Sequence, residues 1–269
     1  MTLDARYEFL LRLARDAGKL AHDFWIRRGT LTVESKGPQD LVSAADREVE
    51  AFIRGEIARA FPDDNFLGEE TVGLFTGNAE RVWIVDPIDG THNFLRGIAF
   101  WNVSIAYVEN GVRTLGVVYD PPHDELFHAR RGAGAWRLNS QGDVRMATAG
   151  TTRLAGAMIA IGHSDRWPEP RYLELRKSLM DASASFRNFG AAALQLAHVA
   201  DGRLDGYVEF ELSSWDAMAG LLLVEEAGGR VAPFPGRDGL TVRAPVVAAV
   251  AGIAAPLFAL VQQAAASGG

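Results

Sequence analysis

The apolar positions near the beginning of the chain recur with the period of an α-helix. Apolar side chains return every three or four residues between residues 3 and 27, and Gly29 follows the run. This spacing gathers them on one face, which predicts a helix that packs against a core. The positions are Leu3, Tyr7, Leu10, Leu11, Ala14, Ala17, Ala21, Phe24 and Trp25.

The pattern changes after residue 30. Residues 31–42 begin with alternating apolar positions and continue into a polar stretch, which predicts two strands joined by a loop. Ser43 to Asp46 then open an amphipathic run, in the manner of a helix start. This second helix is expected to end before Phe61, which precedes a proline.

Short apolar runs separated by Gly, Pro, Asn and Asp follow at 82–85, 103–108 and 115–119. Such runs predict the buried strands of a sheet. Residues 264–269 are predicted to form a frayed tail. In the second half, strands are predicted at 158–161, 204–209 and 246–250, and helices at 172–180, 190–199 and 216–227.

Both halves of the chain mix helices with strands, and the sequence has no internal repeat, low-complexity tract or long linker. A length of 269 residues suits one large domain. We therefore predict a single domain over residues 1–269, which could divide into lobes of about 1–185 and 186–269.

Composition and charge narrow the classes of function. Hydrophobic residues make up 48% of the chain, yet no apolar run approaches the length of a membrane span, and the first residues lack the features of a signal peptide. We therefore expect a cytoplasmic protein without membrane contact. The net charge of -7 argues against a nucleic-acid surface. With no cysteine in the chain, disulfides and thiolate chemistry are excluded, which leaves carboxylates as the leading candidates for a reactive site.

Residues 86–91, Asp-Pro-Ile-Asp-Gly-Thr, carry the strongest candidate chemistry. A predicted buried strand brings Asp86 and Asp89 to a turn, and Gly90 would let a ligand approach the backbone at the start of a helix. Two acids repel a phosphate group unless they hold a divalent cation, and Mg²⁺ commonly binds carboxylates together with a phosphate. A turn that only ends a strand uses the same residue types, so this segment alone leaves both interpretations open.

Other acidic residues lie at similar junctions. Glu69 and Glu70 follow Gly68 after a short apolar run, and Asp216 precedes the predicted helix 217–227. Each has an ordinary explanation: Asp216 as a helix N-cap, and the glutamates as solvated loop charges. Their combination with Asp86 and Asp89 favours a site that draws metal ligands from distant parts of the chain.

The sequence resembles the inositol monophosphatase family at three segments: Gly68 to Glu70, Asp86 to Phe94, and Trp215 to Gly220. Their order and separations fit, and residues 43–46 and 225–229 extend the resemblance over nearly the whole chain. The resemblance implies an α+β fold with alternating αβαβα layers, of the inositol monophosphatase/fructose-bisphosphatase type. It also implies a magnesium-dependent phosphatase that acts on a small phosphorylated metabolite and forms a homodimer.

The same resemblance implies two Mg²⁺ ions bridged by Asp86, with a third, weaker ion near Glu69. By this assignment the first ion is held by Glu69, Asp86 and the carbonyl of Ile88, and the second by Asp86, Asp89 and Asp216.

The resemblance further implies direct attack of water on phosphorus. Thr91 and Glu69 would orient and deprotonate the water, Asp46 would support Thr91, and the amides of Gly90 and Thr91 would receive the phosphate.

Substrate recognition involves residues outside these segments. Glu209 matches a position at which inositol-type members bind a ring hydroxyl, and we expect Asp216 to contact the substrate as well. Lys36 resembles a family lysine on a mobile hairpin near the metals, although a solvated loop lysine is an equally good interpretation. Inositol-1-phosphate is the first candidate substrate.

Two alternatives remain open. Residues 93–97 followed by Trp101 resemble the loop of histidinol-phosphatase members, and a carboxylate such as Glu209 could bind a cationic substrate. The second alternative is a non-catalytic regulatory or binding protein on the same fold, because a fold does not guarantee activity. The complete set of predicted metal ligands counts against it.

Overall fold

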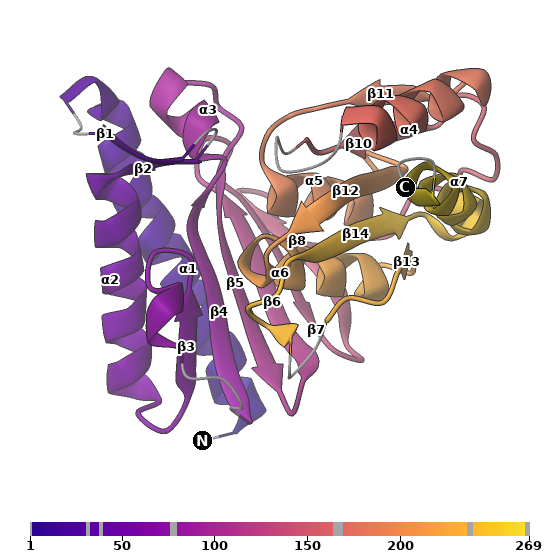
Figure 1. Ribbon diagram of the computed structural model, residues 1–269. Helices are drawn as coiled ribbons and strands as arrows, with labels where there is room; N and C mark the ends of the chain where they lie inside the picture. Colours follow the sequence, from indigo (N-terminus) through magenta and orange to yellow (C-terminus); the bar gives the residue numbers. More distant parts are fainter. Residues whose placement is uncertain are drawn as a thin grey trace.

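The computed structural model describes residues 2–30, 33–37, 40–75, 80–163, 169–235 and 239–266, and the side chains in these ranges except those of residues 30–42 and 169. On one outer side lie α1 (Leu3–Ile26) and α2 (Ala44–Ala60), as the apolar periodicity predicted (Figure 1). Ser43 caps α2, and Asp46 completes a capping box by accepting a hydrogen bond from the Ser43 amide.

Next to these helices lies the larger sheet, with the strand order β3-β4-β5-β6-β7-β8-β9. Strand β3 pairs with β4 in parallel, and every later neighbour pairs in antiparallel fashion. The strands are β3 (Asn65–Gly68), β4 (Arg81–Asp89), β5 (Asn102–Glu109), β6 (Val112–Asp120), β7 (Glu125–Arg130), β8 (Gly134–Asn139) and β9 (Gly142–Arg145).

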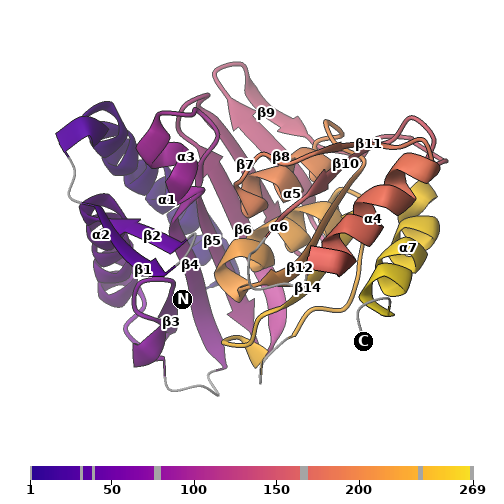
Figure 2. The same ribbon diagram turned by 45° about the horizontal axis from the view of Figure 1, so that its top comes forward.

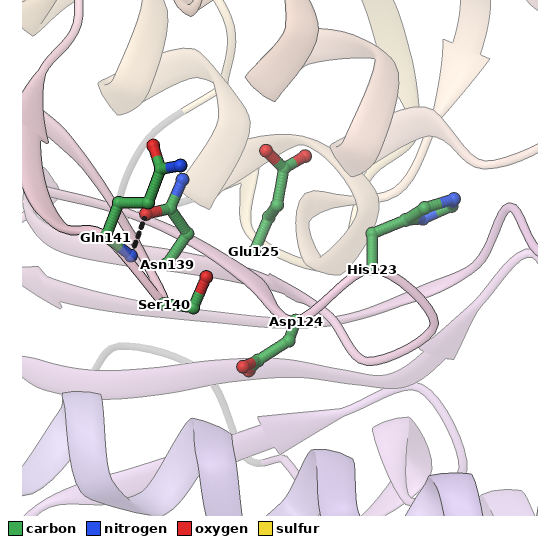
Figure 3. Close-up of a pocket in the computed structure, with 6 residues that line it drawn as sticks. All are labelled: His123, Asp124, Glu125, Asn139, Ser140 and Gln141. Atoms are coloured by element: carbon green, nitrogen blue, oxygen red, sulfur yellow. Dashed lines mark hydrogen bonds between the residues drawn. The ribbon is translucent and has the colours of Figure 1, made fainter.

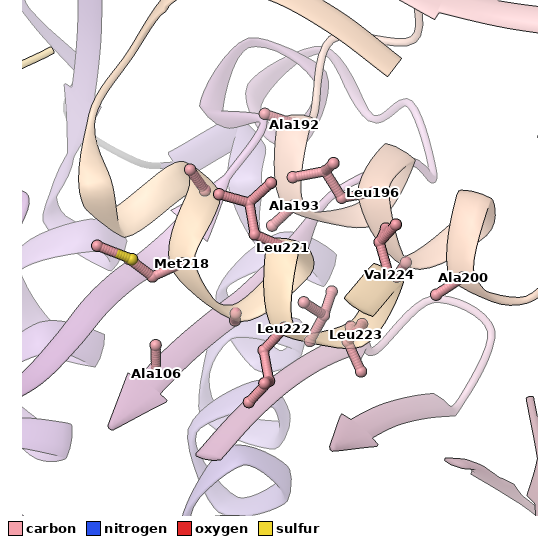
Figure 4. Close-up of a cluster of buried hydrophobic side chains, with 14 of the residues drawn as sticks. Ala106, Ala192, Ala193, Leu196, Ala200, Met218, Leu221, Leu222, Leu223 and Val224 are labelled. Carbon is pink, nitrogen blue, oxygen red and sulfur yellow. The ribbon is translucent and has the colours of Figure 1, made fainter. Parts of the chain in front are cut away.

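A central layer of helices, α5 (Ala192–Ala200) and α6 (Ser214–Glu226), covers the other face of this sheet (Figure 2). Apolar side chains project from several sides of α6, as expected for a helix enclosed by other elements (Figure 4). Glycines allow the close approach: a Cβ at Gly116 of β6 would lie 3.1 Å from the α6 backbone, and one at Gly220 of α6 would lie 2.5 Å from Leu196 of α5.

The smaller sheet follows, with the strand order β11-β10-β12-β14-β13. Helices α4 (Glu169–Asp181) and α7 (Ala254–Ala266) cover its outer face (Figures 1 and 2). The strands are β10 (Met158–Ile161), β11 (Ser185–Arg187), β12 (Gly206–Leu212), β13 (Arg230–Val231) and β14 (Ala244–Ala249). The predicted αβαβα layering and the α+β class are confirmed.

Smaller elements connect the layers. Strands β1 (Val33–Gly37) and β2 (Asp40–Ser43) form the predicted hairpin, and α3 (Thr91–Arg96) follows β4. Three 3₁₀ turns are described, η1 (Arg28–Thr30), η2 (Val72–Leu74) and η4 (Ala251–Ile253). Among the described residues, no helix combines the length and the apolar character needed to span a membrane.

Several sequence expectations need correction. The structure contains elements that were not expected, namely the strands β3, β7, β8, β9, β11 and β13 and the helix α7. Residues 264–266 belong to α7 rather than to a frayed tail, because Leu257, Val261 and Ala264 bury one face of that helix. The division into lobes stays a prediction.

Candidate metal centre

A β-bulge in β4 brings Asp86 and Asp89 together. Asp86 lies opposite Ser104 of β5 and Asp89 lies opposite Asn102, so β4 holds one extra residue between these pairs. Side chains three apart on a regular strand would point to opposite faces, and the extra residue returns both carboxylates to one face. Pro87, which has no amide hydrogen, lies inside the bulge, where it removes no ladder hydrogen bond.

Asp216 joins this pair from the opposite half of the chain. It is the third residue of α6, whose N-cap is Ser213, and its Oδ2 accepts a hydrogen bond of 3.1 Å from the Ser213 amide. Asp216 therefore completes a capping box and is not itself the N-cap. One oxygen from each of Asp86, Asp89 and Asp216 lies within 4.8 Å of the others.

The pKa values of all three carboxyl groups are raised. Burial is the largest cause for Asp86, and the charges of Glu69, Asp89 and Asp216 add to it. The pKa of Asp216 also rises through burial, together with the charges of Asp89 and Glu209. Burial raises the pKa of Asp89 to about 6, although hydrogen bonds from Asn102 and from the amides of the first turn of α5 lower it.

The causes of these pKa values describe a buried group of acids that oppose one another's ionisation, since the charges of Glu69, Asp89 and Asp216 all raise the pKa of Asp86. A divalent cation would offset this repulsion, and oxygen donors of this kind suit hard cations. The donor set therefore fits a metal ion.

Glu69 lies at the end of β3, where its amide donates a hydrogen bond of 3.2 Å to the carbonyl of Val85. Its carboxylate is outside the group of three, but its charge raises the pKa of Asp86. The turn after Glu69 is held by Glu50 of α2, which accepts hydrogen bonds from the Glu70 amide at 2.8 Å and from the Thr71 hydroxyl at 2.7 Å. Glu50 was not anticipated from the sequence.

The structure brings Thr91, Asp46 and Ile88 together. The Thr91 hydroxyl lies 3.1 Å from the Ile88 carbonyl oxygen and 3.2 Å from Oδ1 of Asp46, so it can donate to one of the two at a time. The other oxygen of Asp46 accepts from the Ser43 amide and hydroxyl. Asp46 is thus fixed by the start of α2 and reaches across to the start of α3.

Gly90 forms the N-cap of α3 with φ of 92°, in the left-handed region. A Cβ at this position would lie 3.0 Å from the Ala191 side chain and 3.1 Å from the Gly190 carbonyl oxygen. Only glycine combines this conformation with such close neighbours.

Asn93 holds the loop before α5 against this segment. Its amide nitrogen donates to the carbonyl oxygens of Phe100 at 2.8 Å and Phe189 at 2.6 Å. These bonds fix the backbone beside Gly190.

Glu209 lies on β12 within electrostatic range of the acidic group. Burial raises its pKa to about 7, the hydroxyl of Tyr207 donates a hydrogen bond to it, and the charge of Asp89 adds a smaller increase. Its carboxylate packs on Gly162, where a Cβ would lie only 1.7 Å from Oε2. The side chain of Lys36 lies outside the described part of the structure.

Asn102 is the second residue that sequence reasoning missed. It is fully buried at the start of β5, and its amide nitrogen lies 2.6 Å from Oδ2 of Asp89. Its position opposite Asp89 in the pairing of β4 with β5 indicates its role, but a single asparagine has no spacing pattern that would reveal this role in the sequence.

A separate pocket of about 380 Å³ lies at the turns that join β6 to β7 and β8 to β9 (Figure 3). None of the predicted site residues lines it. Its lining residues are His123, Asp124, Glu125, Asn139, Ser140 and Gln141.

Known proteins share both the sequence and the fold. Residues 2–266 match the inositol monophosphatase family. The chain is 40% identical over 251 residues to an inositol-1-monophosphatase from Mesorhizobium japonicum, covering 92% of both chains. It is 42% identical over 231 residues to the Nus factor SuhB of Xylella fastidiosa, covering 85% of this chain and 82% of the relative.

A solved structure of an inositol monophosphatase from Thermotoga maritima superimposes with a TM-score of 0.85 at 32% identity, covering 98% of this chain and 100% of that one. The match over residues 2–266, the identity to these relatives and the shared layers all indicate common descent. The chain therefore belongs to the inositol monophosphatase family.

Proposed function

We propose that the protein is a Mg²⁺-dependent phosphomonoesterase whose substrate is inositol-1-phosphate. The observation that supports this most directly is the group of Asp86, Asp89 and Asp216, whose oxygens approach within 4.8 Å beside the glycine at the start of α3. Buried acids with raised pKa values call for a cation, and a cation next to free helix amides suits a phosphate ester.

We assign the metal ligands as the family resemblance implies. Glu69, Asp86 and the Ile88 carbonyl would hold one Mg²⁺ ion, and Asp86, Asp89 and Asp216 a second. When bound, such ions supply positive charge to the phosphoryl oxygens and increase the acidity of a water molecule.

The protein's own groups then have distinct tasks. Thr91 and Glu69 hold the attacking water, and the Asp46 carboxylate keeps the Thr91 hydroxyl oriented at 3.2 Å. The amides of Gly90 and Thr91 receive the phosphate oxygens, because the first amides of a helix have no partner within it. Glu209 and Asp216 bind the alcohol portion of the substrate.

Asp86→Asn tests the assigned centre. The variant should lose Mg²⁺-dependent phosphate release by at least about 100-fold, since it removes the charge shared by both ions. Glu48→Gln is a matched control, because it removes one exposed carboxylate of α2 that is not among the assigned ligands. Phosphate release by Asp86→Asn at the rate of the control would contradict the assignment.

The substrate is tested by comparing kcat/KM for inositol-1-phosphate, histidinol phosphate, glycerol-2-phosphate and fructose-1,6-bisphosphate. We expect the highest value for inositol-1-phosphate, with Glu209→Gln reducing that value more than the value for glycerol-2-phosphate. A clear preference for histidinol phosphate would replace the first candidate by the alternative of the histidinol-phosphatase members.

The relative named Nus factor SuhB gives a second candidate function, a role as a Nus factor. Such a role could depend on the fold alone, as in the non-catalytic alternative. Wild-type protein and Asp86→Asn should be compared for their ability to replace SuhB in a bacterium whose own copy is deleted. Equal replacement by both would favour the non-catalytic role. A homodimer in the cytoplasm is part of our proposal and can be checked by light scattering and cell fractionation.

A further inference from the structure

The carboxylate of Asp89 is held by more hydrogen-bond donors than a metal ligand needs. Its Oδ1 accepts from the Ala192 amide at 3.0 Å, and its Oδ2 accepts from the Ala193 amide at 2.8 Å and from the Asn102 side chain at 2.6 Å. The two amides belong to the first turn of α5, whose N-cap, Ala191, provides no side-chain hydrogen bond. Asp89 therefore caps α5 from another element.

These donors use the two oxygens unequally. Each carboxylate oxygen offers about two lone-pair directions. Ala193 and Asn102 donate to Oδ2 and Ala192 donates to Oδ1, while the nearby Leu194 amide also lowers the pKa of this carboxyl group. The direction that remains for a cation is on Oδ1, so Asp89 can bind a metal through one oxygen only while Asn102 stays in place.

Asn102 has no evident structural reason to be an asparagine. It is fully buried, and its Oδ1 is an acceptor without a hydrogen-bond partner in the described part of the structure. A buried acceptor left unpaired costs about 1 to 3 kcal/mol. The Asp89 carboxylate fixes this orientation of the amide, since the opposite one would bring two acceptors together. An apolar residue would avoid that cost, and only the bond to Asp89 favours the asparagine.

We propose that Asn102 is a positioning residue that restricts Asp89 to single-oxygen coordination and thereby favours Mg²⁺ over Ca²⁺ at this centre. The inference rests on the proposed function, because it assumes that Asp89 ligates a divalent ion. Mg²⁺ requires a near-octahedral set of single oxygens, whereas Ca²⁺ accepts 6 to 8 ligands, including carboxylates that bind through both oxygens. Blocking Oδ2 therefore costs Ca²⁺ a ligand that Mg²⁺ would not use.

The experiment measures the affinities of metal-free wild-type protein and of Asn102→Leu for Mg²⁺ and for Ca²⁺ by isothermal titration calorimetry. Leucine has a similar shape and cannot donate. We expect the Kd for Mg²⁺ to rise by about 10-fold or more, as for other residues that orient a metal ligand, and the Kd for Ca²⁺ to stay the same or fall. The ratio of the two Kd values should therefore shift toward Ca²⁺.

Ser104→Ala is the matched control. Ser104 is buried two residues along β5 and donates to the Trp215 carbonyl at 3.1 Å, so its loss removes a buried hydrogen bond of the same strand without touching Asp89. This control should leave the ratio of the Kd values unchanged. Asn102→Ala provides a second, smaller substitution in case leucine prevents folding, and it should shift the ratio in the same direction.

The outcomes separate the two proposals. A wild-type protein that binds neither ion overturns the proposed function and this inference with it. A wild-type protein that binds Mg²⁺, together with Asn102 variants whose ratio matches the wild type, overturns the inference alone. Equal weakening for both ions also overturns it, since a general loss of order at Asp89 would act on both.

Discussion

Gly90 shows at the scale of one residue how the site restricts the sequence. Its φ of 92° excludes most side chains, and a Cβ would lie only 3.0 to 3.2 Å from its neighbours. Both restrictions come from the requirement that the backbone after Asp89 turn sharply into α3 while α5 packs close by.

Gly90→Ala should therefore lower the free energy of unfolding by about 2 to 3 kcal/mol, through strain and through contacts with Ala191 and Gly190. Gly228 offers a matched control, because its φ is 90° but a Cβ at that position would have no neighbour within 4 Å. Gly228→Ala should cost only about 1 kcal/mol. Urea denaturation measures both values, and equal losses would show that close contact at Gly90 is unimportant.

At this scale, the sequence predicted the residues with a spacing signal and missed those without one. Asp86 and Asp89 stand out because two acids flank a proline at the end of an apolar run. Glu50 and Asn102 do not, since each is a single polar residue within an ordinary helix or strand pattern. Their burial and their partners become visible only when distant elements are in contact.

At the scale of elements, the centre depends on how helices and strands are held beside one another. Helix α2 contributes Asp46 to the start of α3 and Glu50 to the turn after β3, so one helix supports two segments of the site. The bulge in β4 likewise brings Asp86 and Asp89 to one face of the sheet. Each of these features fixes the conformation of a short segment that hydrophobic packing alone would not determine.

Glu50→Ala tests the support given by α2. The variant leaves the Glu70 amide and the Thr71 hydroxyl without their acceptor, so Glu69 should be less well oriented. We expect kcat to fall by about 10-fold or more and the Mg²⁺ concentration for half-maximal activity to rise. Glu50→Gln keeps an acceptor for the amide and should restore much of the loss. Equal defects in both variants would contradict a positioning role.

The element predictions failed where the apolar pattern was weak. The strands β8 and β9 carry many exposed or half-buried polar side chains, so the alternation that marks a strand is faint. Helix α7 is rich in alanine, which favours helices strongly but adds little contrast to an apolar pattern. The long helices α1 and α2 were predicted well because each has an apolar face that is clearly distinct from its polar face.

At the scale of the whole molecule, stability should depend on pH through His198 of α5. Its ring lies edge-on to Phe100 and Phe127, at centroid distances of 5.5 and 6.0 Å. Burial, followed by the charge of Arg203, lowers the pKa of His198 to about 4. The unfolded chain, with an ordinary histidine pKa of about 6.5, binds more protons between these values, so stability falls as the pH decreases through this range.

The expected loss between pH 7 and pH 4 is on the order of 3 kcal/mol from this residue. Comparing the wild type with His198→Gln isolates the contribution of His198 to this loss of stability. Asp120, whose pKa burial raises to about 6, acts in the opposite direction in both proteins and cancels in the comparison. Urea denaturation at pH 7 and pH 5 should show a smaller loss for His198→Gln. An exposed histidine, His163, serves as the control substitution, and an identical loss in all three proteins would contradict the assignment.

A divalent ion should stabilise the whole fold. In EDTA, Asp86→Asn should have a higher Tm than wild type, because it removes one of three mutually repelling carboxyl groups while its oxygen can still accept from the Ile88 amide. Added Mg²⁺ at 100 times its Kd should stabilise the wild type by about 2.7 kcal/mol and thereby raise its Tm. It should raise the Tm of the variant far less. Differential scanning calorimetry measures these changes. A variant that is less stable than wild type in EDTA would show that repulsion among the three carboxyl groups does not destabilise the metal-free protein.

The layered architecture was predictable from sequence only through the family resemblance. Periodicity gave the class of most elements, but it could not give the order of strands in either sheet. That order depends on contacts between distant segments, such as the antiparallel pairing of β12 with β14. The placement of α5 and α6 between the two sheets also depends on contacts between distant segments.

The acids of the centre come from β4 and from α6, on opposite halves of the chain. During synthesis, the ribosome therefore releases Asp86 and Asp89 well before Asp216, and the growing chain has an incomplete set of ligands throughout that interval. Under the proposed function, tight capture of a divalent ion would have to wait until α6 has emerged and packed between the sheets. Metal occupancy would then mark a finished molecule and distinguish it from any truncated product of interrupted translation.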